Sequence, residues 1–259
     1  MKPKVAKPKA TKPKATKPAR VKAAPAAPAR APRPPPPSPP LRGVPSPPAS
    51  RARLLVDGEV FGAATLSHQP LPALRLTAGA LVACDPFEVD GPTFARRLRR
   101  GSYDVVAAVA TYPGKHGPGE QHLAAVILEV SAATPVTWEP ATFADQPAAV
   151  DPGYRADSGA GCFMDLHLQA ALGSEPSTFP TASYRALERQ LLDDHHTPTW
   201  GWAIYPEPPT AAGCVAFLGH SSPTRRSYWG LDPHGAVVCL LTDLETFPAD
   251  VWAGPSPAD

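Results

Sequence analysis

The proline-rich, wholly basic N-terminal stretch constrains the fold of this chain more than any other feature. Of the 37 prolines in 259 residues, 16 lie between Met1 and Ser50. Proline removes a backbone donor and fixes φ, so neither a helix nor a sheet can propagate through such a stretch. Its few apolar side chains cannot offset the entropy lost on ordering. We therefore expect residues 1–53 to be a disordered, extended tail and residues 54–259 to form a single globular domain.

Charge divides the chain at the same point. Residues 1–53 carry eight lysines and six arginines and no acidic residue, and the first acid is Asp57. The other 11 of the 25 basic residues stand against all 23 acidic residues, which gives residues 54–259 a net charge of −12. This asymmetry favours a tail that contacts a polyanion, or one that folds back onto an acidic domain. A merely solubilising extension has the same composition.

The start of the tail is a repeat of period five, KPKVA, KPKAT, KPKAT, KPARV, in residues 2–21. It resembles the tails of linker histones and of some bacterial nucleoid proteins. Evenly spaced cations on an open backbone neutralise phosphates without reading bases. We expect weak, non-specific nucleic-acid contact through nine residues: Lys2, Lys4, Lys7, Lys9, Lys12, Lys14, Lys17, Arg20 and Lys22.

From Leu54 onward, short apolar runs alternate with glycine- and proline-containing turns. The pairs GSYDVVAAVATY with HLAAVILEV, and SYWGL with AVVCLLTDL, predict two hairpins. Helical spacing of apolar residues in TASYRALERQLLDDH predicts a helix, and FMDLHLQAAL a second one that begins near Cys162. Many short strands without regular strand–helix alternation predict an α+β fold. We expect one mostly antiparallel, strand-rich domain with two or three short helices.

The cysteines and the apolar runs bear on the compartment. Four cysteines, none in a C-x-x-C pair, sit in mostly apolar surroundings: Cys84, Cys162, Cys214 and Cys239. Such thiols behave as small buried hydrophobes, which favours reduced cysteines and a cytoplasmic protein. No secretory signal and no apolar run of about 18 residues is present. We expect no contact with a membrane.

The stretch YRADSGAGCFMDLH is the first candidate for chemistry. Gly159 and Gly161 permit a sharp turn or a close approach to a ligand. A cysteine after such a turn, at a helix N-terminus, has a lowered thiol pKa and can act as a nucleophile. Cys162 is therefore a candidate nucleophile, and a buried cysteine in a turn is the alternative. Candidate bases for it are His167, His195, His196 and His220.

Carboxylates at the ends of apolar runs are the second candidate. If they converge at one sheet edge, their oxygens can hold Mg²⁺ or Mn²⁺ for phosphoryl hydrolysis. The alternative is that each carboxylate caps its own turn. The candidates are Asp85, Asp157, Asp165 and Asp243.

Four motifs resemble the signature blocks of a bacterial family known as domain of unknown function 4241. They are ACDPF (83–87), TWEPA (137–141), DSGAGCFMD (157–165) and YWGLDPHGAVVCLLTDL (228–244). The resemblance covers about residues 71–247 and implies an α+β domain with no established reaction. In that family a Gly-Trp-Gly-Asp-Gly-like turn precedes the last block. Here that place reads GHSSPTRRSYWG, so that Arg225 and Arg226 stand in place of an acid.

Two functions are compatible with this sequence. The first is a cytosolic binding or interaction module of regulatory or immunity type, whose acidic domain suits a basic protein partner and which needs no cofactor. The second is a hydrolase-like enzyme that uses the Asp157–Asp165 loop with a divalent metal or with Cys162 as nucleophile. We expect the binding module, because nothing in the chain requires catalysis.

Overall fold

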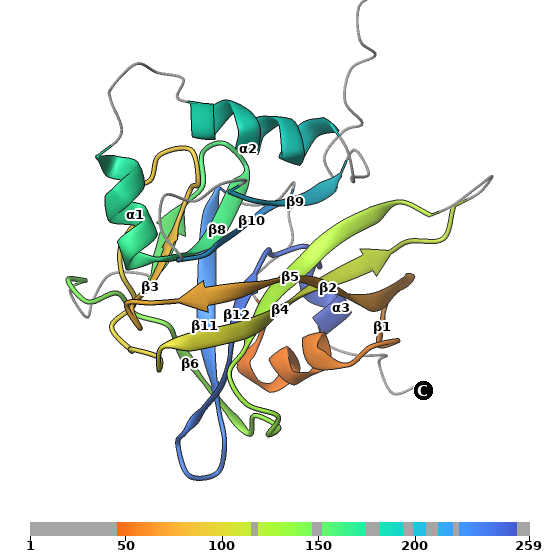
Figure 1. Ribbon diagram of the computed structural model, residues 1–259. Helices are drawn as coiled ribbons and strands as arrows, with labels where there is room; N and C mark the ends of the chain where they lie inside the picture. The colour runs from red at the N-terminus through yellow and green to blue at the C-terminus, as the bar shows by residue number, and fades with distance from the viewer. Residues whose placement is uncertain are drawn as a thin grey trace, which may run out of the picture. The chain divides into compact units, whose positions relative to one another are not determined.

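The structure is a computed structural model that describes residues 46–114, 119–146, 152–174, 182–193, 199–205, 212–219 and 223–252. Within these residues the expected α+β class is confirmed, because two antiparallel sheets are combined with short helices (Figure 1). The nine cations of the expected nucleic-acid tail lie outside the described residues.

The larger sheet, sheet A, has eight strands in which every pairing is antiparallel. Its order is β1-β2-β4-β5-β12-β11-β6, and β7 also pairs with β11. The strands are β1 (Val60–Phe61), β2 (Ala64–Leu76), β4 (Gly101–Thr111), β5 (Gln121–Glu129), β6 (Thr137–Pro140), β7 (Gly153–Arg155), β11 (Thr224–Leu231) and β12 (Val237–Asp243). Seven consecutive residues of β5 are buried, because this sheet is covered on both faces.

The smaller sheet, sheet B, has the order β3-β8-β10-β9 and is also antiparallel. Its strands are β3 (Leu81–Cys84), β8 (Ala160–Asp165), β9 (Trp200–Ile204) and β10 (Cys214–Gly219). Gly79 lies between β2 and β3 with φ of +67°, where the chain passes from sheet A to sheet B. A side chain at this position is strained whatever the space around it.

Helices cover the outer faces of the two sheets (Figure 1). The 3₁₀-helix η1 (Pro48–Leu55) and α3 (Ala249–Trp252) pack on sheet A, whereas α1 (Leu166–Gly173) and α2 (Ala182–Asp193) pack on sheet B. The largest apolar cluster lies between the sheets and includes Phe163, Phe217 and Trp229. The result is a layered fold with three apolar interfaces.

Most of the expected elements are present. The two hairpins are β4–β5 and β11–β12, and the helix expected in TASYRALERQLLDDH is α2. The second helix begins at Leu166 and not near Cys162, so its expected start was wrong. The residues before it form β8, whose six residues are all buried between β3 and β10. A fully buried apolar run does not show whether it is strand or helix.

The first described residues belong to the stretch that the sequence assigned to the tail. Residues 48–53 form most of η1. Arg51 is buried, with its guanidinium 3.4 Å from the centre of the Tyr228 ring, and the Arg53 guanidinium forms an ion pair with Glu59. In the part of the chain described here, no helix is long and apolar enough to cross a membrane.

Candidate functional site

Asp85 follows β3 and fastens the glycine-rich turn before β8. Its carboxylate accepts hydrogen bonds from the Ser158 N–H and hydroxyl, both at 2.8 Å, and from the Phe87 N–H at 3.0 Å. The residue is buried. Because a buried carboxylate needs such donors, Asp85 acts as a link between two segments 73 residues apart in sequence.

Asp157 lies in the same turn but faces solvent. Its side chain is 44% exposed and forms a bidentate ion pair with Arg155. The turn itself depends on its glycines: Gly159 has φ of +83°, and a Cβ on Gly161 would lie 2.5 Å from the Tyr154 hydroxyl. The glycines therefore serve a tight turn and close packing inside the protein.

Cys162 lies inside β8, directly opposite Cys84 of β3, and not at a helix N-terminus as expected. Its exposed fraction is 0%, and the two sulfur atoms are 3.4 Å apart. Burial raises the pKa of the Cys162 thiol well above its usual value, so the thiol stays protonated at neutral pH. A nucleophile must be a thiolate, and this environment disfavours one.

Within the described residues, no candidate base forms a hydrogen bond with the Cys162 thiol, whose neighbours are the thiols of Cys84 and Cys214. His167 lies on α1 with an exposed side chain, and its Nδ1 is 3.0 Å from the Thr77 hydroxyl. His195, His196 and His220 lie outside the described residues.

Asp165 is the N-cap of α1 and is completely buried. It accepts hydrogen bonds from the backbone N–H groups of Thr77 (2.6 Å), Ala78 (2.9 Å) and His167 (2.8 Å). The Thr77 hydroxyl donates a fourth at 3.1 Å. A capping carboxylate satisfies helix N–H groups that have no intrahelical acceptor, and here it also holds the loop after β2.

Asp243 ends β12 in sheet A and is also buried. It accepts hydrogen bonds from the backbone N–H groups of Ser46 (2.6 Å) and Glu245 (2.8 Å). Burial raises the pKa of its carboxyl, while these hydrogen bonds and the nearby Arg51 oppose the rise. Asp243 thus anchors the chain that leads into η1.

Asp85, Asp165 and Asp243 do not come together. Asp85 follows the residue opposite Cys162, whereas Asp165 lies opposite Leu81 at the other end of the β3–β8 pair. Four residues of strand correspond to roughly 13 Å. Asp243 belongs to the other sheet. Among the described residues, no group of three or more His, Cys, Asp or Glu side chains is arranged to hold a metal ion.

Arg225 is a buried polar residue whose position the sequence did not indicate. It is 1% exposed, and its guanidinium donates to the carbonyl oxygens of Gly159 (2.8 Å) and Gly219 (3.0 Å). Burial lowers its pKa, and Tyr154, Glu245 and Asp85 oppose that effect. Arg225 therefore connects β11 of sheet A to two segments of sheet B. The sequence gives one indication of this residue: Arg225 lies where the chain departs from the family pattern.

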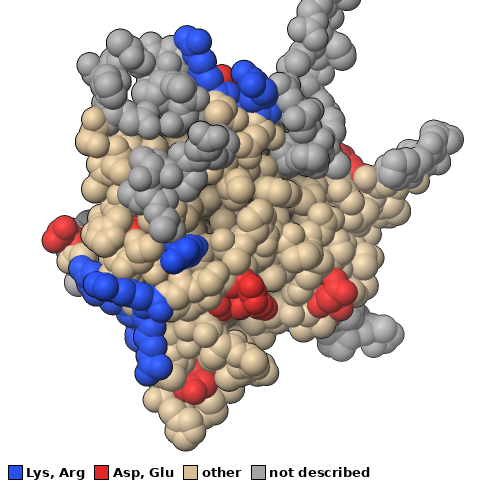
Figure 2. Space-filling view, viewed as in Figure 1, with Lys and Arg blue, Asp and Glu red and all other residues tan. Residues whose placement is uncertain are grey.

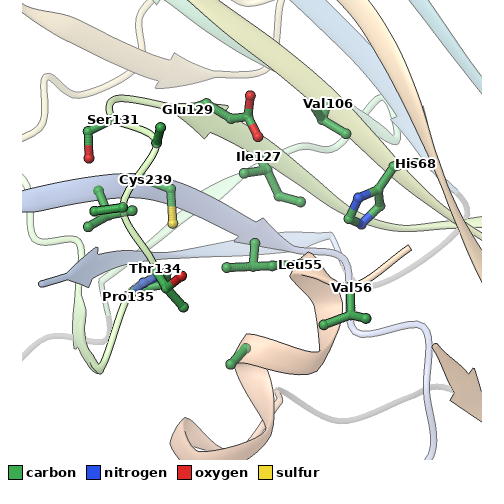
Figure 3. A pocket seen from close by; sticks show the side chains of 14 residues that line it. Leu55, Val56, His68, Val106, Ile127, Glu129, Ser131, Thr134, Pro135 and Cys239 are labelled. Atoms are coloured by element: carbon green, nitrogen blue, oxygen red, sulfur yellow. The ribbon is translucent and has the colours of Figure 1, made fainter. Parts of the chain in front are cut away.

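A pocket of about 340 Å³ opens on the outer face of sheet A (Figure 3). It lies between the end of η1 and the loop after β5, with Leu55 on one side and Ile127 on the other. Among its lining residues Glu129 is the one carboxylate and His68 the one imidazole. The other lining residues are Ala52, Val56, Val106, Ser131, Ala132, Ala133, Thr134, Pro135, Val238 and Cys239.

The imidazole and the carboxylate of the pocket differ in whether they can bind a ligand. The Nε2 atom of His68 lies 2.9 Å from the Leu54 carbonyl oxygen, so this nitrogen is occupied as a donor. Glu129 is exposed at the end of β5. Val56, at the rim, is 48% exposed. The pocket combines an apolar floor with one solvent-facing negative charge, which suits an apolar group next to a cation.

The structure places the candidate residues in separate turns and strands of a two-sheet α+β fold. The chain belongs to the family described as Protein of unknown function (DUF4241), whose model matches residues 74–215, more than half of the 259 residues. The resemblance found in the motifs is thereby confirmed. The block at 228–244 and Arg225 lie beyond the matched range. No curated protein and no solved structure matches the chain.

The buried carboxylate of Asp243 leads to a prediction about pH. Its pKa is raised above 3.8 in the folded state, so the folded protein holds this proton more tightly than the unfolded chain does. Stability from this group is present below the unfolded pKa and is lost as pH rises through the folded pKa. Unfolding in urea, measured as pH rises from about 4, should show this loss in the wild type but not in Asp243→Asn. A stability difference that does not vary with pH would contradict the assignment.

Proposed function

We propose that this protein is a cytosolic binding module of regulatory or immunity type, and that the pocket beside η1 receives an apolar side chain of a basic partner segment. One observation carries the proposal. The buried candidate groups already hold turns and strands together, whereas the pocket presents an apolar floor and the solvent-exposed carboxylate of Glu129. The proposed hydrolase loop has no comparable support.

The partner's chemistry follows from charge and size. Residues 54–259 have a net charge of −12, and Glu129 adds a negative charge at the pocket. The volume of about 340 Å³ is at the lower end for small-molecule pockets, so a partner's side chain is the better fit. The four free cysteines support a reducing compartment such as the cytosol.

The test uses two exposed valines as a matched pair. Val56 lines the pocket and is 48% exposed, whereas Val60 in β1 does not line it and is 55% exposed. A lysine at position 56 places a cation where the basic partner binds, so Val56→Lys should weaken binding about tenfold. Val60→Lys makes the same change of charge elsewhere and should have little effect.

The measurement is fluorescence polarisation of the full chain with labelled peptides that alternate leucine with arginine or leucine with glutamate. The proposal expects the arginine peptide to bind better, and Glu129→Gln to weaken it more than Asp104→Asn, since Asp104 is exposed and outside the pocket. Equal effects of the two valine substitutions on binding of the arginine peptide would reject the pocket as the binding site.

A further inference from the structure

The segment FARRLRRG, residues 94–101, concentrates positive charge on an otherwise acidic domain. Four arginines fall within the five residues 96–100, although residues 54–259 contain only 11 basic residues in all. No acidic residue occurs between Asp90 and Asp104. We call residues 96–100 the arginine loop. Like charges this close repel one another. Their grouping therefore indicates an anionic partner that would relieve the repulsion.

The backbone of the arginine loop is held in place by its neighbours. Phe94 and Leu98 are buried, and their N–H groups donate to the carbonyl oxygens of Leu81 (2.9 Å) and Gly79 (3.0 Å). A Cβ at Gly79 would lie 2.7 Å from the Leu98 carbonyl oxygen, so the close approach requires glycine. The Tyr103 hydroxyl adds a bond to the loop's backbone. These contacts preorganise the loop, which lowers the entropy lost on binding.

The arginine side chains point outward and mostly lack acidic partners. Arg97, Arg99 and Arg100 are exposed, and within the described ranges no carboxylate forms an ion pair with them. Arg96 pairs with Glu139. Arg75 is also exposed and lies opposite Ser102 in the β2–β4 pairing, next to the end of the loop.

The space-filling view agrees with this grouping. Figure 2 shows basic side chains gathered over the end of β2 and the start of β4, whereas the acidic side chains on this face lie in small separate groups. The arginine loop and Arg75 therefore belong to the same region of the surface.

The composition of this surface indicates the class of partner. Arginine forks bind phosphate through two parallel hydrogen bonds, and contacts to a phosphate backbone need no apolar anchor. Protein interfaces, by contrast, usually have an apolar core. The exposed large apolar residues of the described chain are Val56, Val60, Val136 and Ile204, and none belongs to residues 75–103. We propose that the arginine loop binds the phosphate backbone of a nucleic acid without reading its sequence.

The test compares two triple variants of the full chain that lose the same charge. One is Arg97→Ala/Arg99→Ala/Arg100→Ala, and the control is Arg155→Ala/Arg185→Ala/Arg189→Ala; all six side chains are exposed. The basic tail is present in both, so its contribution cancels. The probes are a labelled 20-nucleotide single strand and a 20-base-pair duplex, with polarisation read from about 50 to 200 mM salt.

The loop variant should reduce the slope of log K against log salt by about 2 to 3, because each lost phosphate contact removes roughly 0.7 to 0.9. At low salt its affinity should fall at least about tenfold, and the control should change the slope by less than about 1. Unchanged melting temperatures establish that both variants are folded. Equal losses in the two variants would overturn the proposal. The proposal would also be overturned if polyglutamate of equal length bound the wild type as tightly and lost as much affinity in the loop variant. The loop would then be a site for acidic protein.

Discussion

Replacing Arg225 with methionine is expected to lower the free energy of unfolding by about 3 kcal/mol, because one buried and one partly buried carbonyl oxygen lose a charged donor. These oxygens belong to Gly159 and Gly219, at the turn before β8 and at the end of β10. Methionine keeps much of the apolar volume, so the loss reports the hydrogen bonds more than a cavity. Urea unfolding monitored by tryptophan fluorescence measures it.

Arg155→Met is the matched control for this substitution. Arg155 lies on β7, the strand that pairs with the start of β11, but its side chain is 78% exposed. Its ion pair with Asp157 is on the surface, so the control should leave the free energy of unfolding almost unchanged. A neutral or stabilising effect of Arg225→Met would contradict this expectation. It would show that the cost of desolvating the buried guanidinium equals or exceeds the stabilisation from its hydrogen bonds, as is known for some buried charges.

The elements that the sequence predicted correctly depend on local pattern. The β11–β12 hairpin follows from apolar strands around an Asp-Pro-His-Gly turn, where Gly235 has φ of +78°. The helix α2 follows from helical spacing, with Leu187 and Leu191 buried on one face. In each case the signal lies within about 20 residues, and no distant contact is needed to read it.

The contacts that the sequence did not predict join distant segments. The charge and proline-rich neighbours of Arg51 predict a tail residue, yet its guanidinium stacks on the Tyr228 ring. The local sequence predicts Cys162 at the start of a helix, although it pairs with Cys84, which is 78 residues away. Neither partner is visible in a local window. The local sequence around a charged or apolar residue is the same whichever distant element that residue packs against.

The carboxylates show the same limit for the candidate site. An aspartate at the end of an apolar run is typical of both a turn cap and a metal ligand, and Asp85, Asp165 and Asp243 all fit that description. The structure distinguishes them by their donors: each accepts at least two backbone N–H hydrogen bonds from residues around it. One donor to each carboxylate is local, two residues further along the chain. The other donors, from Ser158, Thr77, Ala78 and Ser46, come from chain segments brought close only by folding.

Replacing Asp165 with alanine is the second substitution for which we expect a large effect, a loss of about 3 to 4 kcal/mol in the free energy of unfolding. The partly buried N–H groups of Thr77, Ala78 and His167 would lose an acceptor that is itself completely buried. Asp165→Asn retains one acceptor oxygen and should lose less. Asp157→Ala is the control, because that carboxylate is 44% exposed and pairs only at the surface.

The same variants separate capping from metal binding. A ligand at one hundred times its dissociation constant stabilises a protein by about 2.7 kcal/mol, which a thermal-shift measurement detects readily. If Asp165 is a cap, Mg²⁺ and Mn²⁺ should change the melting temperature of the wild type and of Asp165→Asn by the same amount. A rise in the wild type that is absent from Asp165→Asn but retained in Asp157→Ala would instead identify Asp165 as a metal ligand. The α1 N-terminus would then belong to a site and not only to the fold.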